Sequence, residues 1–232
     1  MGFISNLFCT ILTYIRNIIS TWNIPAWIYD QVITKLWTGP TYLKLFEHMQ
    51  PRLDKYKRIL DVGTGTGQPL YSIIDKFPKD TQVVAIDIDK NYIKKATKLF
   101  KDVRNVRVRE QDFYELADTK EKYDMIVFSN SFMLMPDTKR AIEVAKGLLN
   151  PGGRIFFLMT LYAKKKKFTE KFKPYLKYYT TIDFGNITYE WEFEDLLRSS
   201  KLNINHKERL FYKFAPMWLL FRVFLVETEI KA

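Results

Sequence analysis

The chain has 232 residues, of which 47% are hydrophobic, 16% aromatic and 27% charged. This composition is sufficient for a folded core, so it excludes intrinsic disorder and collagen-like or low-complexity fibres. The length fits one domain with an appendage, or at most two small domains. One cysteine and two histidines exclude a disulfide framework and argue against a cysteine- or histidine-rich metal centre, so we expect no metal site. The net charge of +11 favours an anionic partner, either nucleic acid or a lipid surface.

The first 29 residues form a segment without acidic side chains. Apolar residues recur between Ile4 and Trp22 with the spacing of one helical face, but polar residues interrupt every turn, so the segment is too polar to span a membrane. It also lacks the basic start and the cleavage site of a signal peptide. We therefore predict an amphipathic helix over residues 1–29 that lies in a membrane interface or packs on its own domain. The first alternative makes the protein intracellular and peripherally membrane-associated, without distinguishing mitochondrial from endoplasmic reticulum membranes.

Strands and helices alternate through the centre of the chain. The predicted strands cover residues 58–62, 83–87, 106–109, 123–128 and 154–159, and the predicted helices cover 69–74, 92–100 and 138–149. Apolar strands separated by helices indicate a doubly wound, mostly parallel sheet with helices on both faces. A basic, aromatic insertion at 161–190 follows, and then a helix at 192–199 and strands at 203–210 and 219–227. We therefore expect one α/β domain over residues 30–232 with a seven-stranded sheet.

Three glycines follow the first predicted strand in the sequence Asp61-Val62-Gly63-Thr64-Gly65-Thr66-Gly67. Glycines let the backbone turn sharply and let a ligand approach without intervening Cβ atoms. The acidic residue before this loop suits a cationic ligand better than a pyrophosphate, and Asp87 ends the next strand, where doubly wound folds place a carboxylate on ribose hydroxyls. A ribose without phosphate and with a cationic tail describes S-adenosylmethionine; a nicotinamide or flavin nucleotide is the alternative.

Taken in order, four motifs resemble those of the class I S-adenosylmethionine-dependent methyltransferases. They are the glycine loop, Asp87, Gln111-Asp112-Phe113 and Leu149-Asn150-Pro151-Gly152-Gly153. The resemblance covers about residues 55–160 and, more loosely, the C-terminal hairpin. It implies the Rossmann-like methyltransferase fold, S-adenosyl-L-methionine as cofactor, and enzymatic methyl transfer.

The resemblance also implies a set of cofactor-binding residues, namely Asp61, Gly63, Thr64, Gly65, Gly67, Gln68, Asp87, Ile88, Asp112, Phe113, Ser129 and Asn130. In this set the glycine backbone contacts the methionine part and Asp61 organises the loop. The ribose is assigned to Asp87, the adenine to Asp112 and Phe113, and the methyl-transfer site to the tip of the fourth strand.

Several of these and other polar residues have a simpler interpretation. Asp112 would cap a turn in the loop after the third strand, Asp124 would be structural, and His48 and His206 would have surface roles. The lysines at 164–167 fit a solvated face or a contact with lipid or nucleic acid.

No general base stands out in the sequence. Tyr29 and Asn130 are the candidates that we favour for the catalytic site, and Asp30, His48 and Tyr162 are also open as bases.

The acceptor is expected to be a hydrophobic small molecule or a lipid, because within the family the chain looks most like members that act on lipids, quinones and other hydrophobic acceptors. Residues 129–132 read Ser-Asn-Ser-Phe, where base-methylating members of the family carry Pro-Pro-Tyr, which counts against nucleic acid as the acceptor. Two alternatives stay open: a catalytically silent subunit of a membrane protein assembly, and an RNA methyltransferase.

Overall fold

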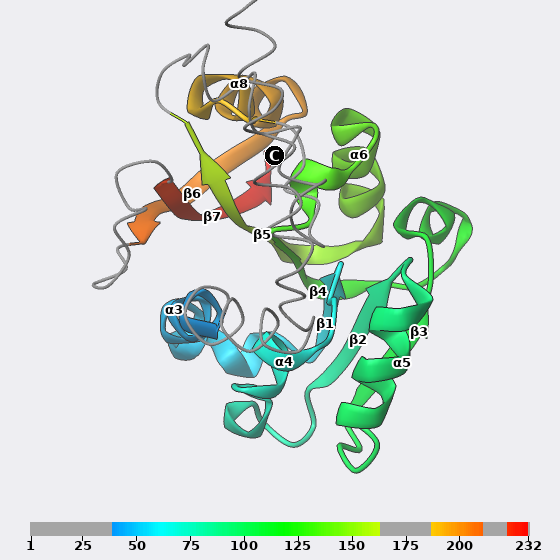
Figure 1. The fold of residues 1–232 in the computed structure, drawn as a ribbon. Helices are drawn as coiled ribbons and strands as arrows, with labels where there is room; N and C mark the ends of the chain where they lie inside the picture. The colour runs from blue at the N-terminus through cyan, green and yellow to red at the C-terminus, as the bar shows by residue number, and fades with distance from the viewer. Residues whose placement is uncertain (1–38, 163–186, 211–221, 232) are drawn as a thin grey trace, which may run out of the picture.

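Seven strands form one sheet in the order β3-β2-β1-β4-β5-β7-β6 (Figure 1). The computed structural model describes residues 39–162, 187–210 and 222–231. Within this part of the chain, neighbours from β3 to β5 run parallel, whereas β7 is antiparallel to both β5 and β6. The strands are β1 (Arg58–Val62), β2 (Gln82–Asp87), β3 (Val106–Glu110), β4 (Tyr123–Ser129), β5 (Leu149–Leu161), β6 (Leu202–Leu210) and β7 (Arg222–Ile230). The predicted doubly wound, mostly parallel sheet is confirmed.

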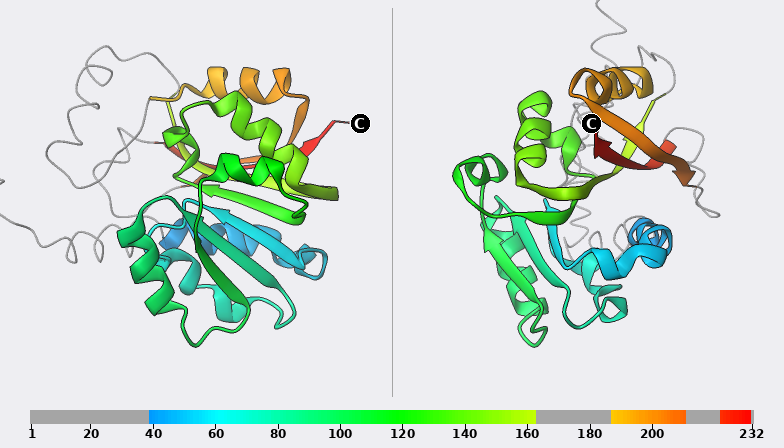
Figure 2. Two further views of the ribbon diagram at one scale, coloured as in Figure 1. Left: turned by 90° about the vertical axis from the view of Figure 1, so that its right-hand side faces the viewer. Right: turned by 180° about the vertical axis from the view of Figure 1, so that it is seen from behind.

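Helices cover both faces of this sheet (Figures 1 and 2). The α-helices are α3 (Gly39–Met49), α4 (Gln68–Tyr71), α5 (Lys90–Leu99), α6 (Thr138–Leu148) and α8 (Glu190–Ser199). Short 3-10 helices are η2 (Gln50–Lys55), η3 (Ile74–Lys76), η4 (Phe113–Asp118) and η5 (Phe132–Leu134). The helix predicted at 69–74 is shorter than expected, because the Ser72 hydroxyl bonds back to the Pro69 carbonyl at 2.7 Å and the chain continues as a 3-10 turn.

Each buried strand contributes to two hydrophobic layers. On one face, α3, α4 and α5 pack on the strands, and the Phe100 ring, just after α5, contacts Tyr71 of α4 with 5.7 Å between centroids. On the other face, α6 and α8 pack on the alternate residues of the same strands. Strands that are covered on both faces are apolar at most positions, which is why they read as nearly continuous hydrophobic runs in the sequence.

A charged cluster lies beneath the C-terminal hairpin of β6 and β7. Glu227 accepts two hydrogen bonds from the Arg52 guanidinium, at 2.6 and 2.8 Å, and lies 2.6 Å from His48 Nε2. Arg154 Nε approaches the same carboxylate to 3.3 Å, and the imidazole ring of His206 stacks on that of His48 with 4.1 Å between centroids. The expectation of a surface role is wrong for His48, because its side chain is tied into this cluster.

Asp124 has a structural role, as its place at the start of a strand indicated. Its Oδ2 accepts hydrogen bonds from the backbone N–H groups of Lys57 and Arg58, both at 2.8 Å, and its Oδ1 accepts from the Asn150 amide at 2.7 Å. The carboxylate therefore joins the beginnings of β1, β4 and β5.

The expected insertion leaves and re-enters the fold at one point. Tyr162, just after β5, pairs with Tyr189, just before α8, and the backbone N–H of Tyr162 bonds to the Thr188 carbonyl at 3.0 Å. Residues 163–186, with the lysine run, and the amphipathic helix expected at 1–29 lie outside the described residues. Within the described ranges, no helix has the length and apolar character needed to cross a membrane.

Candidate cofactor site

The parallel strands bring the expected cofactor residues to one edge of the sheet. The glycine loop follows β1, Asp87 ends β2, Asp112 follows β3, and Ser129 ends β4. Because β3, β2, β1 and β4 are parallel neighbours, their carboxyl ends meet at the same edge. This is the edge at which open α/β sheets bind ligands.

Hydrogen bonds to β2 hold the glycine loop in place. The backbone N–H groups of Gly63 and Thr64 both donate to the Ile86 carbonyl, at 2.9 and 3.0 Å. The next N–H group, that of Gly65, donates to Asp87 Oδ2 at 2.9 Å. Asp87 therefore has a structural task in addition to the expected contact with the ribose.

The three glycines are required for different reasons, although all have positive φ angles of +73°, +58° and +76°. A Cβ atom on Gly63 would lie 2.4 Å from the Ser131 Cβ, and one on Gly67 would lie 2.5 Å from the Phe100 ring. A Cβ atom on Gly65 would meet nothing within 4 Å. The outer two glycines are therefore fixed by packing inside the protein, whereas the middle one faces open space of the kind a ligand needs.

Asp61 lies beneath the loop and is 1% exposed. Its Oδ1 accepts a hydrogen bond from the Tyr42 hydroxyl at 2.7 Å. Burial raises the pKa of Asp61 to about 6; the hydrogen bond from Tyr42 and the nearby Thr64 hydroxyl partly oppose that rise, and the charge of Asp87 adds to it. A buried carboxylate with one neutral partner favours a cationic ligand, since such a ligand would compensate its charge.

Three buried polar atoms at this edge have no hydrogen-bond partner among the described residues: Asp61 Oδ2, Thr64 Oγ1 and Asn130 Nδ2. Buried polar groups are normally paired, so unpaired ones indicate a missing partner. An anionic acceptor, a hydroxyl and an amide donor suit a ligand with both a cationic and an anionic group. The amino-acid part of S-adenosylmethionine is such a ligand, so these residues fit that cofactor.

The ribose and adenine candidates flank this group. Asp87 Oδ1 accepts the Asp89 N–H at 2.9 Å, yet both carboxylate oxygens retain lone pairs for hydroxyl donors. Ile88 directly follows it and is 73% exposed, so an apolar surface is available beside the ribose position. Gln68 begins α4 and is also exposed.

Asp112 and Phe113 are placed differently from one another. Asp112 is exposed, and its Oδ1 accepts the Tyr114 N–H at 2.8 Å, so it caps η4 and leaves its second oxygen for a ligand. The Phe113 side chain is 3% exposed and packs against Phe128 with 5.2 Å between ring centroids. Its ring therefore belongs to the core, and only its backbone could face the adenine.

The end of β4 has an unusual backbone. Asn130 has a positive φ of 53° and donates its N–H to the Leu158 carbonyl at 2.7 Å. A non-glycine residue in this region is strained, and such strain is concentrated at functional sites. Next to it, the buried Ser131 contacts Gly63, and its hydroxyl donates to the Val62 carbonyl at 2.5 Å. The tip of β4 and the glycine loop are therefore fixed against each other.

Of the other proposed bases, Tyr29 and Asp30 lie outside the described residues. Burial raises the pKa of Tyr162 to about 12, which makes it a poor base at neutral pH. Sequence reasoning missed Tyr42 and Ser131. Tyr42 could have been found, because a tyrosine on the apolar face of a helix needs a partner for its hydroxyl group.

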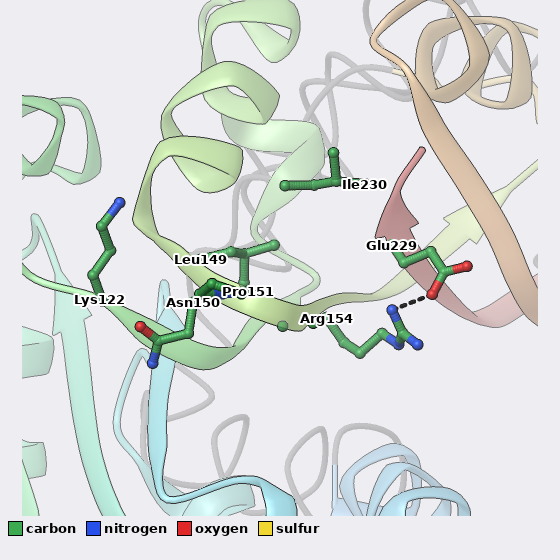
Figure 3. A pocket seen from close by; sticks show the side chains of 9 residues that line it. Lys122, Leu149, Asn150, Pro151, Arg154, Glu229 and Ile230 are labelled. Carbon is green, nitrogen blue, oxygen red and sulfur yellow. Dashed lines mark ion pairs between the residues drawn. The ribbon is translucent and has the colours of Figure 1, made fainter. Parts of the chain in front are cut away.

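A hollow of about 620 Å³ lies at the opposite edge of the sheet (Figure 3). It is lined by Lys122, Leu149, Asn150, Pro151, Gly152, Gly153, Arg154, Glu229 and Ile230. These residues surround the beginning of β5, which pairs with the beginning of β4, whereas the glycine loop follows the end of β1. The hollow is therefore separate from the cofactor edge.

Comparison with known proteins agrees with this geometry. A family model described as a methyltransferase domain matches residues 53–210, more than half of the chain. An rRNA adenine N-6-methyltransferase of Bacteroides fragilis is 30% identical over 77% of this chain and 67% of that protein. A demethylmenaquinone methyltransferase of Chlamydia caviae is 22% identical over 84% and 91%. Among solved structures, an S-adenosylmethionine-dependent methyltransferase of Clostridium acetobutylicum has the same fold, with a TM-score of 0.62, 16% identity, and coverage of 91% of this chain and 100% of that one.

The chain therefore belongs to the S-adenosylmethionine-dependent class I methyltransferase family. S-adenosyl-L-methionine is the cofactor of this family, and the unpaired groups beneath the glycine loop fit it. The chain spans 55% and 67% of the length of the first two curated relatives it matches.

Proposed function

We propose that the protein is an S-adenosylmethionine-dependent methyltransferase that methylates a hydrophobic small molecule or a lipid while peripherally bound to a membrane. The observation that carries the choice of acceptor is the apolar surface around the cofactor edge. Leu134, just after β4, is 44% exposed, and Trp191, near the C-terminal end of β5, is 50% exposed. The Trp191 ring stacks on the buried Tyr189 with 6.4 Å between ring centroids, so the core supports the exposed tryptophan from beneath.

The reaction would be a displacement at the methyl carbon, for which the cofactor supplies an electrophilic methyl group and a thioether leaving group. The protein has to hold the acceptor atom in line with the breaking bond, and such positioning supplies much of the acceleration. Asn130 is suited to this task, because its strained backbone and its buried amide lie at the tip of β4.

RNA is the second candidate acceptor, supported by the similarity to the Bacteroides rRNA methyltransferase and by the net charge of +11. The local charge at the cofactor edge argues against it. Asp87, Asp89, Asp112 and Asp137 all lie at the carboxyl ends of strands or in the loops that follow them, and their charges would repel a phosphate backbone.

The acceptor class can be tested with the purified full-length chain and S-adenosylmethionine that carries a labelled methyl group. Total lipid extract and total RNA from the same cells are offered in parallel, and the labelled product is identified by mass spectrometry. We expect label in the lipid fraction that disappears with Asp87→Ala, a variant of an expected cofactor residue. Label in RNA alone would support the second candidate, and binding of the cofactor without label in either fraction would support a catalytically silent subunit.

Membrane association is tested separately by liposome flotation at low and high salt. The segment 1–29, for which the sequence predicts an amphipathic helix, has little charge, so binding through it should persist at high salt, whereas attraction through lysines should fade. Deletion of residues 2–22 should release the protein at high salt and leave cofactor binding intact. Full-length protein that stays off liposomes at both salt concentrations would contradict membrane association.

A further inference from the structure

Helix α3 lies across a row of four residues on one face of the sheet. In this row, Asp61 pairs with Val127, Val127 with Phe156, and Phe156 with Glu227, so the row crosses β1, β4, β5 and β7 at one level. The apolar residues of α3 belong to the same core cluster as the two central residues, and the His48 ring lies edge-on to Phe156 with 6.2 Å between centroids. A buried carboxylate therefore stands at each end of the surface that α3 covers.

Helix α3 contacts both carboxylates. Tyr42, in its first turn, donates its hydroxyl hydrogen to Asp61 at 2.7 Å, and His48, in its last turn, lies 2.6 Å from Glu227. At the Glu227 end, Arg52 and Arg154 add further contacts. At the Asp61 end, Oδ2 has no partner among the described residues, and neither has the nearby Thr64 hydroxyl.

We propose that Tyr42 is a positioning residue for the cofactor: its hydroxyl group fixes Asp61 Oδ1, so that Oδ2 is presented to the ammonium group of the cofactor's methionine part. This inference rests on the proposed function. Tyr42 does not itself touch the cofactor, so its effect passes through Asp61. The open space at Gly65, where a Cβ atom would meet nothing within 4 Å, is the room that this part of the cofactor needs.

A phenol is well suited to this task for an electrostatic reason. Burial raises the pKa of Tyr42 above its ordinary value, so the hydroxyl group stays protonated and acts as a donor. An arginine in its place would fix the carboxylate equally well but would cancel the charge that attracts a cationic ligand. A neutral donor orients Asp61 and leaves its charge for the cofactor.

The test compares Tyr42→Phe with wild type for three ligands by isothermal titration. S-adenosylmethionine and S-adenosylhomocysteine carry the amino-acid part, whereas 5′-methylthioadenosine lacks it. We expect Tyr42→Phe to weaken binding of the first two about tenfold, the usual effect of losing a hydrogen bond to a charged group. Binding of 5′-methylthioadenosine should change by less than about twofold, because this ligand has no ammonium group for Asp61 to hold.

A pH series adds a second measurement, the pH dependence of cofactor affinity, which should not change if Tyr42 has a purely structural role. The affinity of wild type for S-adenosylmethionine should rise with pH as Asp61 ionises. The other groups that act on Asp61 are the Asp87 carboxylate, whose charge raises its pKa, and the Thr64 hydroxyl, which lowers it, and both are unchanged in Tyr42→Phe. In this variant the rise should therefore occur at higher pH, because the carboxylate has lost the Tyr42 donor. Tyr56→Phe is the matched control, since it removes a hydroxyl group from another buried tyrosine on the same face of the sheet. We expect this control to behave as wild type.

Two results would overturn the inference. Equal weakening of all three ligands would mean that Tyr42 acts only on the fold, and unchanged affinity for S-adenosylmethionine would mean that Asp61 needs no positioning. Wild-type protein that binds neither S-adenosylmethionine nor S-adenosylhomocysteine would instead refute the proposed function. The failure of one proposal can therefore be told from the failure of the other.

Discussion

Asp61 and Glu227 stand at the two ends of one row on the sheet and are both 1% exposed, yet their surroundings are opposite. Glu227 is contacted by three basic side chains, those of Arg52, Arg154 and His48. Burial by itself would raise the pKa of Glu227, but the hydrogen bonds from Arg52 and His48 lower it to about 2. Asp61 has no such basic partner among the described residues: burial raises its pKa to about 6, the hydroxyl groups of Tyr42 and Thr64 partly oppose the rise, and the negative charge of Asp87 adds to it.

The difference separates a structural charge from a charge that is available to a ligand. The protein compensates Glu227 internally, so its ionised form stabilises the fold. Asp61 is compensated only in part, so its ionised form costs folding free energy that a cationic ligand can offset. Burial alone would not distinguish these two carboxylates, and their partners do.

The largest effect is expected for Glu227→Gln. Removing this charge leaves the two arginines without their shared partner, so the free energy of unfolding should fall by about 3–5 kcal/mol. Urea denaturation measures the loss, and Glu229→Gln is the control, because the side chain of Glu229 is 31% exposed and should contribute less than about 1 kcal/mol. Equal losses of stability in both variants would show that the buried Glu227 contributes no more to the free energy of unfolding than the partly exposed Glu229.

Asp61→Asn should weaken cofactor binding without lowering the free energy of unfolding, the opposite of what is expected for Glu227→Gln. Cofactor affinity should drop by about 2–3 kcal/mol, because a hydrogen bond to a charged group is lost. At pH 8 the free energy of unfolding should stay the same or increase, since the ionised carboxylate no longer has to be buried. A variant that unfolds more easily but binds the cofactor normally would assign Asp61 to the structural class with Glu227.

The pH dependence of stability should distinguish the two carboxylates by sign. The folded-state pKa of Asp61 is raised from 3.8 to about 6, so its contribution is fully present below pH 3.8 and is lost as the pH rises through 6. The loss should be about 3 kcal/mol, given about 1.4 kcal/mol per pKa unit, and should be absent in Asp61→Asn. The folded-state pKa of Glu227 is lowered from 4.5, so its contribution is present above pH 4.5 and is lost as the pH falls toward 2. Urea denaturation of wild type and both variants across this range checks the signs, and curves of equal slope would contradict them.

The smallest effect is expected for His48→Gln. Glutamine can still donate to Glu227, and the two arginine contacts remain, so the loss of stability should be about 1 kcal/mol. Cofactor affinity should not change, because Tyr42 lies at the other end of the helix. Titration with S-adenosylmethionine checks this, and a clear loss of affinity would show that the two ends of α3 are coupled.

The sheet and the glycine loop could be predicted because their signals are local. Apolar runs marked the strands, and the three glycines followed by Asp87 marked the cofactor edge. The sheet order, which the sequence did not predict, places these motifs side by side.

The partners of the two buried carboxylates could not be predicted in the same way. Tyr42 and Asp61 are 19 positions apart, and His48 and Glu227 are 179 positions apart. They meet only because α3 crosses three neighbouring pairs of strands, and no local pattern records that crossing. For the same reason Ser131 gave no sign that it packs on Gly63.

The pairing of Tyr162 with Tyr189 has an evolutionary consequence. The chain departs from the sheet and returns to it at two points that are already held together, and the entropic cost of closing a loop grows only slowly with its length. Insertions, deletions or exchange of residues 163–186 would therefore leave β5 and α8 where they are. This stretch can diverge between descendants of one gene, or be swapped between them as a cassette, while the glycine loop continues to serve the same nucleoside.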